Sequence, residues 1–288
     1  MAEFVDPDAL VSTRWLAERL DDPTIRVVDS TWFLPNVDRS GRAEFATGHV
    51  PGALYWDIDE IADADDPRPH MLPDPAAFEG HMARFGIGAT TAVVVYDRVA
   101  MMTVGRVWWM LRYFGHDRVS ILDGGYAKWA AEDRPSETGL GHAPAAPAAF
   151  TARPRPHLVR SLDQVMELIA GPDEQILDAR SAGRFAAAEP EPRPGCRAGH
   201  IPGSMNLPFN TLVDPGTGTI RPPQALCAVF RDAGIDFARP VVTTCGSGVT
   251  ACMLAFGLHL LGHDRVAVYD GSWSEWGMRH DTPIEPAG

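Results

Sequence analysis

The stretch VVTTCGSGVTA, residues 241–251, decides the fold and the chemistry of this chain. Its first four residues are apolar or β-branched and predict a buried strand, which is followed by a turn with two glycines and then by helical spacing. Amides of such a turn can face one anion, and the start of a helix adds partial positive charge. Cys245 ends the strand, so we expect a nucleophilic thiolate there, rather than a small buried cysteine beside a tight turn.

The chain contains one internal repeat. The motif GHVPG at 48–52 returns as GHIPG at 199–203, and GHDRV at 115–119 returns at 262–266, each about 150 residues later. We therefore expect two copies of one domain, over residues 1–139 and 158–288. Residues 140–157 between them are rich in alanine, proline and glycine and are predicted to be a linker.

Short apolar runs alternate with longer helical patterns in both halves. This alternation predicts an α/β fold in which each domain is a mainly parallel sheet flanked by helices, with sites outside the carboxyl ends of the strands. The expected strands are 26–29, 92–96, 119–122, 175–178, 240–244 and 266–269, and the expected helices are 75–85, 105–114, 161–169, 223–233 and 250–261.

Charge and composition exclude several function classes. The 288 residues include 25 basic and 38 acidic side chains, a formal net charge of −13, which argues against nucleic-acid and anionic-membrane partners. No stretch approaches the roughly 18 apolar residues of a membrane helix. The acidic N-terminus does not resemble a signal peptide, and four scattered cysteines suggest reduced thiols, so we expect a cytoplasmic protein. No metal-ligand spacing is present.

The two copies differ at the position of the cysteine. Counting from Val93 opposite Val241, the first copy has Asp97 where the second has Cys245. A carboxylate cannot perform thiol chemistry, so we expect the first domain to be non-catalytic. The histidine of the repeated motif is present in both copies, as His49 and His200. Because the non-catalytic copy also has it, it is predicted to serve folding.

The chain resembles the two-domain rhodanese superfamily of sulfurtransferases. Three features carry this resemblance: the tandem repeat, the RVWW motif at 106–109 and the loop CGSGVT at 245–250. Within it, this loop is similar to that of the 3-mercaptopyruvate sulfurtransferases. Thiosulfate sulfurtransferases carry Arg and Lys after the cysteine, where this chain has Gly246 and Ser247. The resemblance implies a sulfurtransferase that uses 3-mercaptopyruvate, with thiosulfate as the alternative donor.

The resemblance also implies a mechanism. Cys245 would take sulfur from the donor as a persulfide, release pyruvate and pass the sulfur to a thiol acceptor such as thioredoxin, or to cyanide. No cofactor and no metal are expected. The amides of the loop would stabilise the anionic sulfur, with Gly246, Gly248, Val249 and Thr250 as the residues that bind it.

Further site residues follow from the same resemblance. Arg184 and Arg193 match its substrate-binding segment and suit a carboxylate, although Arg184 could pair with a nearby acid and Arg193 could be a solvated loop residue. Ser247, His70 and Asp59 match a suggested proton relay, although Asp59 could cap a helix and His70 could satisfy a loop. These residues would place the site between the domains, with Met101 and Met102 lining it.

Two other function classes fit the sequence less well. A cysteine-dependent phosphatase needs an arginine at position 251, where this chain has Ala251. A non-enzymatic interaction module would carry an inactive or buried cysteine in both halves, and the intact loop at Cys245 argues against it. Arg180 is predicted to be structural, paired with Asp178.

Overall fold

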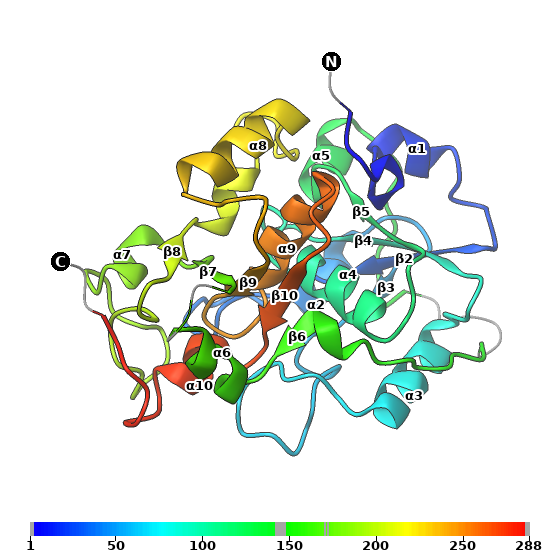
Figure 1. Ribbon diagram of the computed structural model, residues 1–288. Helices are drawn as coiled ribbons and strands as arrows, with labels where there is room; N and C mark the ends of the chain where they lie inside the picture. The colour runs from blue at the N-terminus through cyan, green and yellow to red at the C-terminus, as the bar shows by residue number, and fades with distance from the viewer. Residues whose placement is uncertain (1–2, 142–147, 170, 172, 286–288) are drawn as a thin grey trace.

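Each half of the chain builds one five-stranded sheet in which all neighbouring strands are parallel (Figure 1). The computed structural model describes residues 3–141, 148–169, 171 and 173–285. The first sheet has the order β1-β5-β4-β2-β3 and the second β6-β10-β9-β7-β8, so the same arrangement occurs twice. The strands are β1 (Leu10–Val11), β2 (Ile25–Asp29), β3 (Leu54–Tyr55), β4 (Ala92–Tyr96), β5 (Val119–Leu122), β6 (Val159–Arg160), β7 (Gln175–Asp178), β8 (Met205–Asn206), β9 (Val241–Thr244) and β10 (Val266–Tyr269).

Helices cover these sheets. All four residues of the central strand β9 are buried, as expected for a parallel strand covered on both faces. The helices are α1 (Thr13–Ala17), α2 (Gly41–Thr47), α3 (Pro75–Phe85), α4 (Val104–Tyr113), α5 (Gly125–Ala131), α6 (Leu162–Leu168), α7 (Ala182–Phe185), α8 (Pro223–Asp232), α9 (Ala251–Leu260) and α10 (Ser272–Trp276), with 3-10 turns η1 (Pro7–Ala9), η2 (Pro156–Leu158) and η3 (Phe209–Leu212). None of the described helices is long and apolar enough to cross a membrane.

The six predicted strands and five predicted helices are confirmed, with ends that differ by at most one residue. Local signals set these ends. In α3, for example, the Asp74 carboxylate accepts hydrogen bonds from the first amides, Pro75 starts the helix, and Gly86 ends it with a left-handed backbone at φ 63°. The two-residue strands and the short helices were not predicted, because so few residues carry no periodicity.

The two domains pack against each other through α4 and α9, which lie side by side (Figure 1). A side chain at Gly105 of α4 would lie 2.7 Å from the amide nitrogen of Met253, so glycine permits this close approach. Trp108 of α4 meets Phe256 of α9 edge to face, at 5.1 Å between ring centroids. Because α4 and α9 follow β4 and β9, the loops at the carboxyl ends of both strands reach the domain interface.

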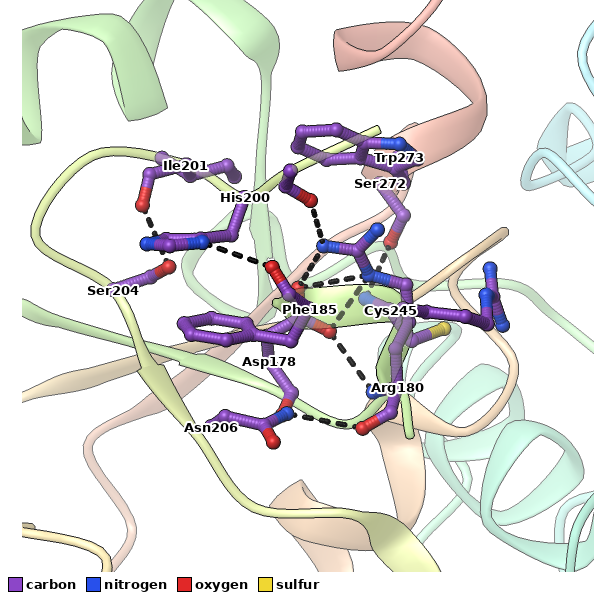
Figure 2. Close-up of polar contacts among 12 residues, drawn as sticks. Asp178, Arg180, Phe185, His200, Ile201, Ser204, Asn206, Cys245, Ser272 and Trp273 are labelled. Atoms are coloured by element: carbon purple, nitrogen blue, oxygen red, sulfur yellow. Dashed lines mark hydrogen bonds and ion pairs between the residues drawn. The ribbon is translucent and has the colours of Figure 1, made fainter. Parts of the chain in front are cut away.

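His49 and His200 have the same surroundings in the two domains. Each ring stacks on a phenylalanine, Phe45 or Phe185, and each Nδ1 lies 2.9 to 3.0 Å from that residue's carbonyl oxygen. Figure 2 shows this arrangement for His200 and Phe185. Each also pairs through its backbone with the end of its own domain. These contacts support a folding role for both histidines.

The proposed linker separates the two sheets. Of residues 140–157, those at 142–147 lie outside the described residues, and the only regular structure in the remainder is the start of η2. We keep 1–139 and 158–288 as the proposed domains.

Candidate active site

Cys245 lies directly after β9 and lines a cavity of about 260 Å³ between the two domains. Trp32, Leu34 and Met102 of the first domain form part of its wall, and the second domain contributes the rest. The Cys245 residue is only 2% exposed. A thiol in this position can meet a small molecule that enters the cavity, while bulk water has little access to it.

The loop from Cys245 to Thr250 is held from behind by the start of α10. The Ser272 hydroxyl accepts hydrogen bonds from the amides of Cys245 and Gly248, at 3.2 and 3.1 Å, and donates to the carbonyl of Tyr269. Ser272 adopts a left-handed backbone at φ 49°, which costs a non-glycine residue about 1 kcal/mol or more. The loop is therefore fixed before any donor arrives.

Several amides of this loop are available to an incoming anion. In the part of the chain that the structure describes, the N–H groups of Gly246, Ser247, Val249 and Thr250 donate to no oxygen. Gly248 turns the loop with φ +71°. Free amides around one thiol can stabilise negative charge on sulfur without reorganisation.

The corresponding loop of the first domain shows how such amides are used. There the buried Asp97 carboxylate accepts hydrogen bonds from the amides of Val99, Met101 and Thr103 at 2.8 to 3.0 Å, and from the Thr103 hydroxyl. Burial raises the pKa of Asp97, and these hydrogen bonds oppose that shift. The first loop thus contains its own hydrogen-bond acceptor, whereas the second offers amides next to a thiol.

The predicted trio of Ser247, His70 and Asp59 is brought together at the loop. His70 Nδ1 lies 3.0 Å from Ser247 Oγ, and His70 Nε2 lies 2.8 Å from Asp59 Oδ1. Trp32 Nε1 donates to the second carboxylate oxygen of Asp59 at 2.7 Å. The hydrogen bond from His70 lowers the pKa of Asp59, so this carboxylate accepts from Nε2–H and leaves Nδ1 to accept the Ser247 proton.

Arg184 lies against the loop but is paired with an acid. Its guanidinium is within 3.0 Å of where a side chain at Gly246 would start, and its Nε lies 3.2 Å from Glu191 Oε2. Both interpretations of Arg184 therefore have structural support: it faces the cavity, and it forms an ion pair.

Arg193 is the less engaged cation. It lines the same cavity, and its guanidinium forms no hydrogen bond or ion pair with the described residues. Burial lowers the pKa of Arg193, and the charge of the Cys245 thiolate would oppose this shift. A cation beside the thiol with open hydrogen-bonding positions suits an anionic substrate group.

Arg180 is paired with Asp178, as predicted. Its guanidinium forms a salt bridge with Asp178 at 2.6 Å, donates to the carbonyl of Gly199, and lies 4.2 Å from the ring centre of Trp273 (Figure 2). Figure 2 shows this network beside Cys245. Glu191 accepts from both Arg180 and Arg184, so one carboxylate links the buried network to the cavity wall.

The expectation for the two methionines is half right. Met102 lines the cavity, but Met101 is buried in the apolar core at 1% exposure. The reason is that the amide of Met101 binds Asp97, which turns the segment so that only Met102 faces the cavity.

The other three cysteines do not line the cavity. Cys252 is fully buried in α9, where its thiol donates to the carbonyl of Gly248 and burial raises its pKa. Cys196 is partly exposed near the carbonyl of Trp273. Among the described residues, no group of three or more His, Cys, Asp or Glu side chains is placed to hold a metal ion.

Four residues of the site were missed from the sequence. Trp32 carries no motif, and Glu191 lies in the segment of Arg193 but has no pattern that shows its partners. Asp270 and Ser272 follow the strand in a DGS segment whose DG part occurs in both copies. That repeated pair was a usable signal, because it lies at the carboxyl end of a strand in each half.

Comparison with known proteins agrees with this architecture. The rhodanese-like domain family matches residues 12–132 and 161–279. The mouse 3-mercaptopyruvate sulfurtransferase is 41% identical over 94% of this chain and 92% of that protein, and the rat thiosulfate sulfurtransferase is 42% identical over the same shares. The crystal structure of SseA from Escherichia coli superposes with a TM-score of 0.84 at 38% identity, covering 93% of this chain and 99% of that chain. The chain belongs to the rhodanese family and consists of two rhodanese domains.

Proposed function

We propose that this protein is a sulfurtransferase that accepts sulfur from 3-mercaptopyruvate on Cys245. The proposal rests on one observation. The Cys245 thiol lies in a small cavity beside loop amides that donate no hydrogen bond to the described residues. The names of the mouse and Escherichia coli relatives support the same donor. Sulfur transfer through a thiolate needs no cofactor.

The first half-reaction is a displacement at sulfur. The Cys245 thiolate attacks the donor sulfur, a new S–S bond forms, and the C–S bond of the donor breaks. Its electron pair leaves with the carbon fragment as the enolate of pyruvate. The amides of Gly246, Val249 and Thr250 are proposed to donate to the bound sulfur. Gly248 is proposed to shape the loop instead, because its amide already donates to the Ser272 hydroxyl.

Ser247, His70 and Asp59 are proposed to move the proton. The donor thiol loses its proton to Ser247, whose own proton passes to His70 Nδ1, and the reverse transfer protonates the enolate to pyruvate. Asp59 holds the imidazole in the tautomer that accepts from serine. Proton uptake and release are then balanced within one turnover.

The donor carboxylate is proposed to bind Arg193, assisted by Arg184. Arg193 has unused guanidinium donors, whereas Arg184 shares its charge with Glu191. A guanidinium matches a carboxylate in two parallel hydrogen bonds. Both predicted arginines thus remain in the proposed site, and Arg193 is proposed to contribute more than Arg184 to binding the carboxylate.

Thiosulfate is the second candidate donor. The similarity to the rat thiosulfate sulfurtransferase supports it. Against it, positions 246 and 247 carry no positive side chain that would hold a second negative charge beside the thiol. We therefore favour mercaptopyruvate.

The persulfide is then proposed to react with a thiol acceptor such as thioredoxin, or with cyanide. The acceptor thiolate attacks the outer sulfur and restores the Cys245 thiolate. We also propose a cytoplasmic location, supported by four cysteines that are all free thiols.

The test is kcat/KM for 3-mercaptopyruvate and for thiosulfate, measured side by side with one thiol acceptor and with Cys245→Ser as the blank. A clear preference for mercaptopyruvate supports the proposal. A preference for thiosulfate would overturn the donor assignment, and activity with neither would overturn sulfur transfer.

A further inference from the structure

We propose that the buried ion pair of Arg106 and Asp270 positions the proton relay by fixing the segment that carries His70. Arg106 belongs to α4 in the first domain, and Asp270 follows β10 in the second. The inference rests on the proposed function, because it concerns the same site. Arg106 is thereby a positioning residue for sulfur transfer, acting through His70.

One guanidinium reaches three acceptors on both sides of the domain interface. Nη1 of Arg106 donates to Asp270 and lies 3.4 Å from the carbonyl of Gly248 in the catalytic loop, and Nη2 donates to the carbonyl of His70. The Arg106 side chain is 1% exposed and that of Asp270 is 5% exposed. The pair is therefore shielded from water.

The same ion pair holds both ends of a three-residue segment. Arg106 binds the carbonyl of His70, and the second carboxylate oxygen of Asp270 accepts from the amide of Leu72 at 2.9 Å. His70 has a left-handed backbone at φ 63°, which a non-glycine residue keeps only when its surroundings enforce it. These two contacts supply that enforcement, and they direct the imidazole to Ser247.

The catalytic loop fits the ion pair closely. A side chain at Gly248 would start 2.7 Å from the carbonyl oxygen of Asp270 and 3.1 Å from Nη1 of Arg106. No substitution at Gly248 is possible without moving either the loop or the ion pair. The relay segment, the ion pair and the loop therefore move as one unit.

The non-catalytic side of the interface provides an internal comparison. Asp123, the counterpart of Asp270 in the first copy, accepts from the amide of Ile220 in the second domain at 2.8 Å. The position that corresponds to Arg106 is Met253, and Asp123 forms no ion pair within the described part of the chain. Docking of the domains through a carboxylate and an amide thus needs no arginine, and the buried arginine is present only on the side of the relay.

The physical cost of the pair supports a specific role. Burying two charges costs desolvation free energy that their attraction often does not exceed, so such pairs are poor at adding stability. A planar guanidinium can satisfy several acceptors in fixed directions, which an ammonium group cannot. We therefore expect lysine to keep the charge at position 106 but to release His70.

Kinetics of Arg106→Lys test this role, with Arg112→Lys as the matched control. Arg112 lies on the same helix and also stacks on a tryptophan, but it contacts neither the loop nor residues 70–72. We expect Arg106→Lys to lower kcat at least tenfold with KM changed less than threefold, and Arg112→Lys to change neither. Equal kinetics of the two variants would overturn the inference.

A double variant separates positioning from general damage. If Arg106 acts through His70, Arg106→Lys combined with His70→Ala loses no more activity than His70→Ala alone. Losses that multiply would contradict the inference. Should Arg106→Lys fail to fold, Asp270→Asn takes its place, with Asp123→Asn as its control on the other side of the interface.

An NMR measurement that needs no turnover tests the inference independently of the proposed function. The ring signals of His70 in ¹⁵N–¹H NMR spectra, assigned with His70→Ala, report the hydrogen bonds of both ring nitrogens. We expect them to shift in Arg106→Lys and not in Arg112→Lys. Unchanged His70 signals would overturn the inference even in an active enzyme, whereas a shift in a protein inactive with both donors would sink only the proposed function.

Discussion

Asp97 and Cys245 occupy the same position in the two domains, each at the end of the central strand and at the start of a loop of backbone amides. In the first domain the amides bind the Asp97 carboxylate, and in the second several of them are free beside the thiol. The chain therefore contains a filled and an open form of the same anion-binding loop. The filled form shows that the amides of such a loop can surround one acceptor group.

Replacing Asp97 by alanine should destabilise the first domain and leave the chemistry of Cys245 intact. The loop would lose the acceptor of four hydrogen bonds, which costs about 2–4 kcal/mol of unfolding free energy. Sulfate should restore part of this by occupying the vacated amides. Urea unfolding with and without sulfate measures both effects, and the same sulfate response in the wild type would contradict the account.

Replacing Cys245 by serine should abolish sulfur transfer without unfolding the protein. A serine hydroxyl is not ionised at neutral pH and cannot form a persulfide. We expect turnover to fall to the level of a reaction without enzyme while the thermal unfolding midpoint stays within a few degrees. Turnover above that level would mean that another thiol, such as Cys196, carries the sulfur.

Removing the imidazole by His70→Ala should lower kcat about 10²- to 10⁴-fold, the range typical of general acid–base catalysis. KM for the donor should change little, because His70 holds Ser247 and Asp59 rather than the donor carboxylate. Steady-state kinetics measure both values. A loss confined to KM would place His70 in donor binding instead.

Truncating either arginine should raise KM for mercaptopyruvate. Arg193→Ala removes a guanidinium without a protein partner, so KM for mercaptopyruvate should rise at least tenfold, in line with about 1.5–3 kcal/mol for a charged hydrogen bond. Arg184→Ala should also raise KM, and it leaves Glu191 with Arg180 as its remaining partner. If Arg193→Ala leaves KM unchanged, the carboxylate binds elsewhere.

Asp123 should make stability depend on pH. Burial raises its pKa to about 6, while the amide of Ile220 and the charge of Lys128 oppose that shift. A carboxyl whose pKa is raised by folding favours the fold while it is protonated, so this contribution is complete below about pH 4 and is lost as the pH rises through 6. Asp123→Asn should remove the dependence, which unfolding of both proteins between pH 4 and 7 measures. Parallel stability curves would rule out Asp123 as the cause.

The sequence predicted those parts of the fold that repeat a pattern over several residues. The central strands and long helices have apolar runs or helical spacing, and the repeated motifs located the second copy. The strand β3 has two residues and no such signal. The position of Cys245 at a strand end followed from the same rules.

Other parts of the site depend on contacts between residues far apart in the chain. The pairing of Arg184 with Glu191 depends on how one loop folds back, and that of Arg106 with Asp270 on how two domains dock. The motif containing Arg106 was visible in the sequence, but nothing local shows which carbonyl or carboxylate a side chain will reach. Family resemblance supplied His70 and Asp59, and only the geometry shows that they meet Ser247.

The central claim is that Cys245 receives sulfur from 3-mercaptopyruvate. Intact-protein mass spectrometry after mixing with this donor, without an acceptor, tests it directly. The account predicts a mass gain of one sulfur atom with release of one pyruvate per site. The added sulfur maps to the peptide with Cys245, is absent in Cys245→Ser and is removed by a thiol acceptor. An unmodified Cys245 in a protein that still releases pyruvate would contradict it.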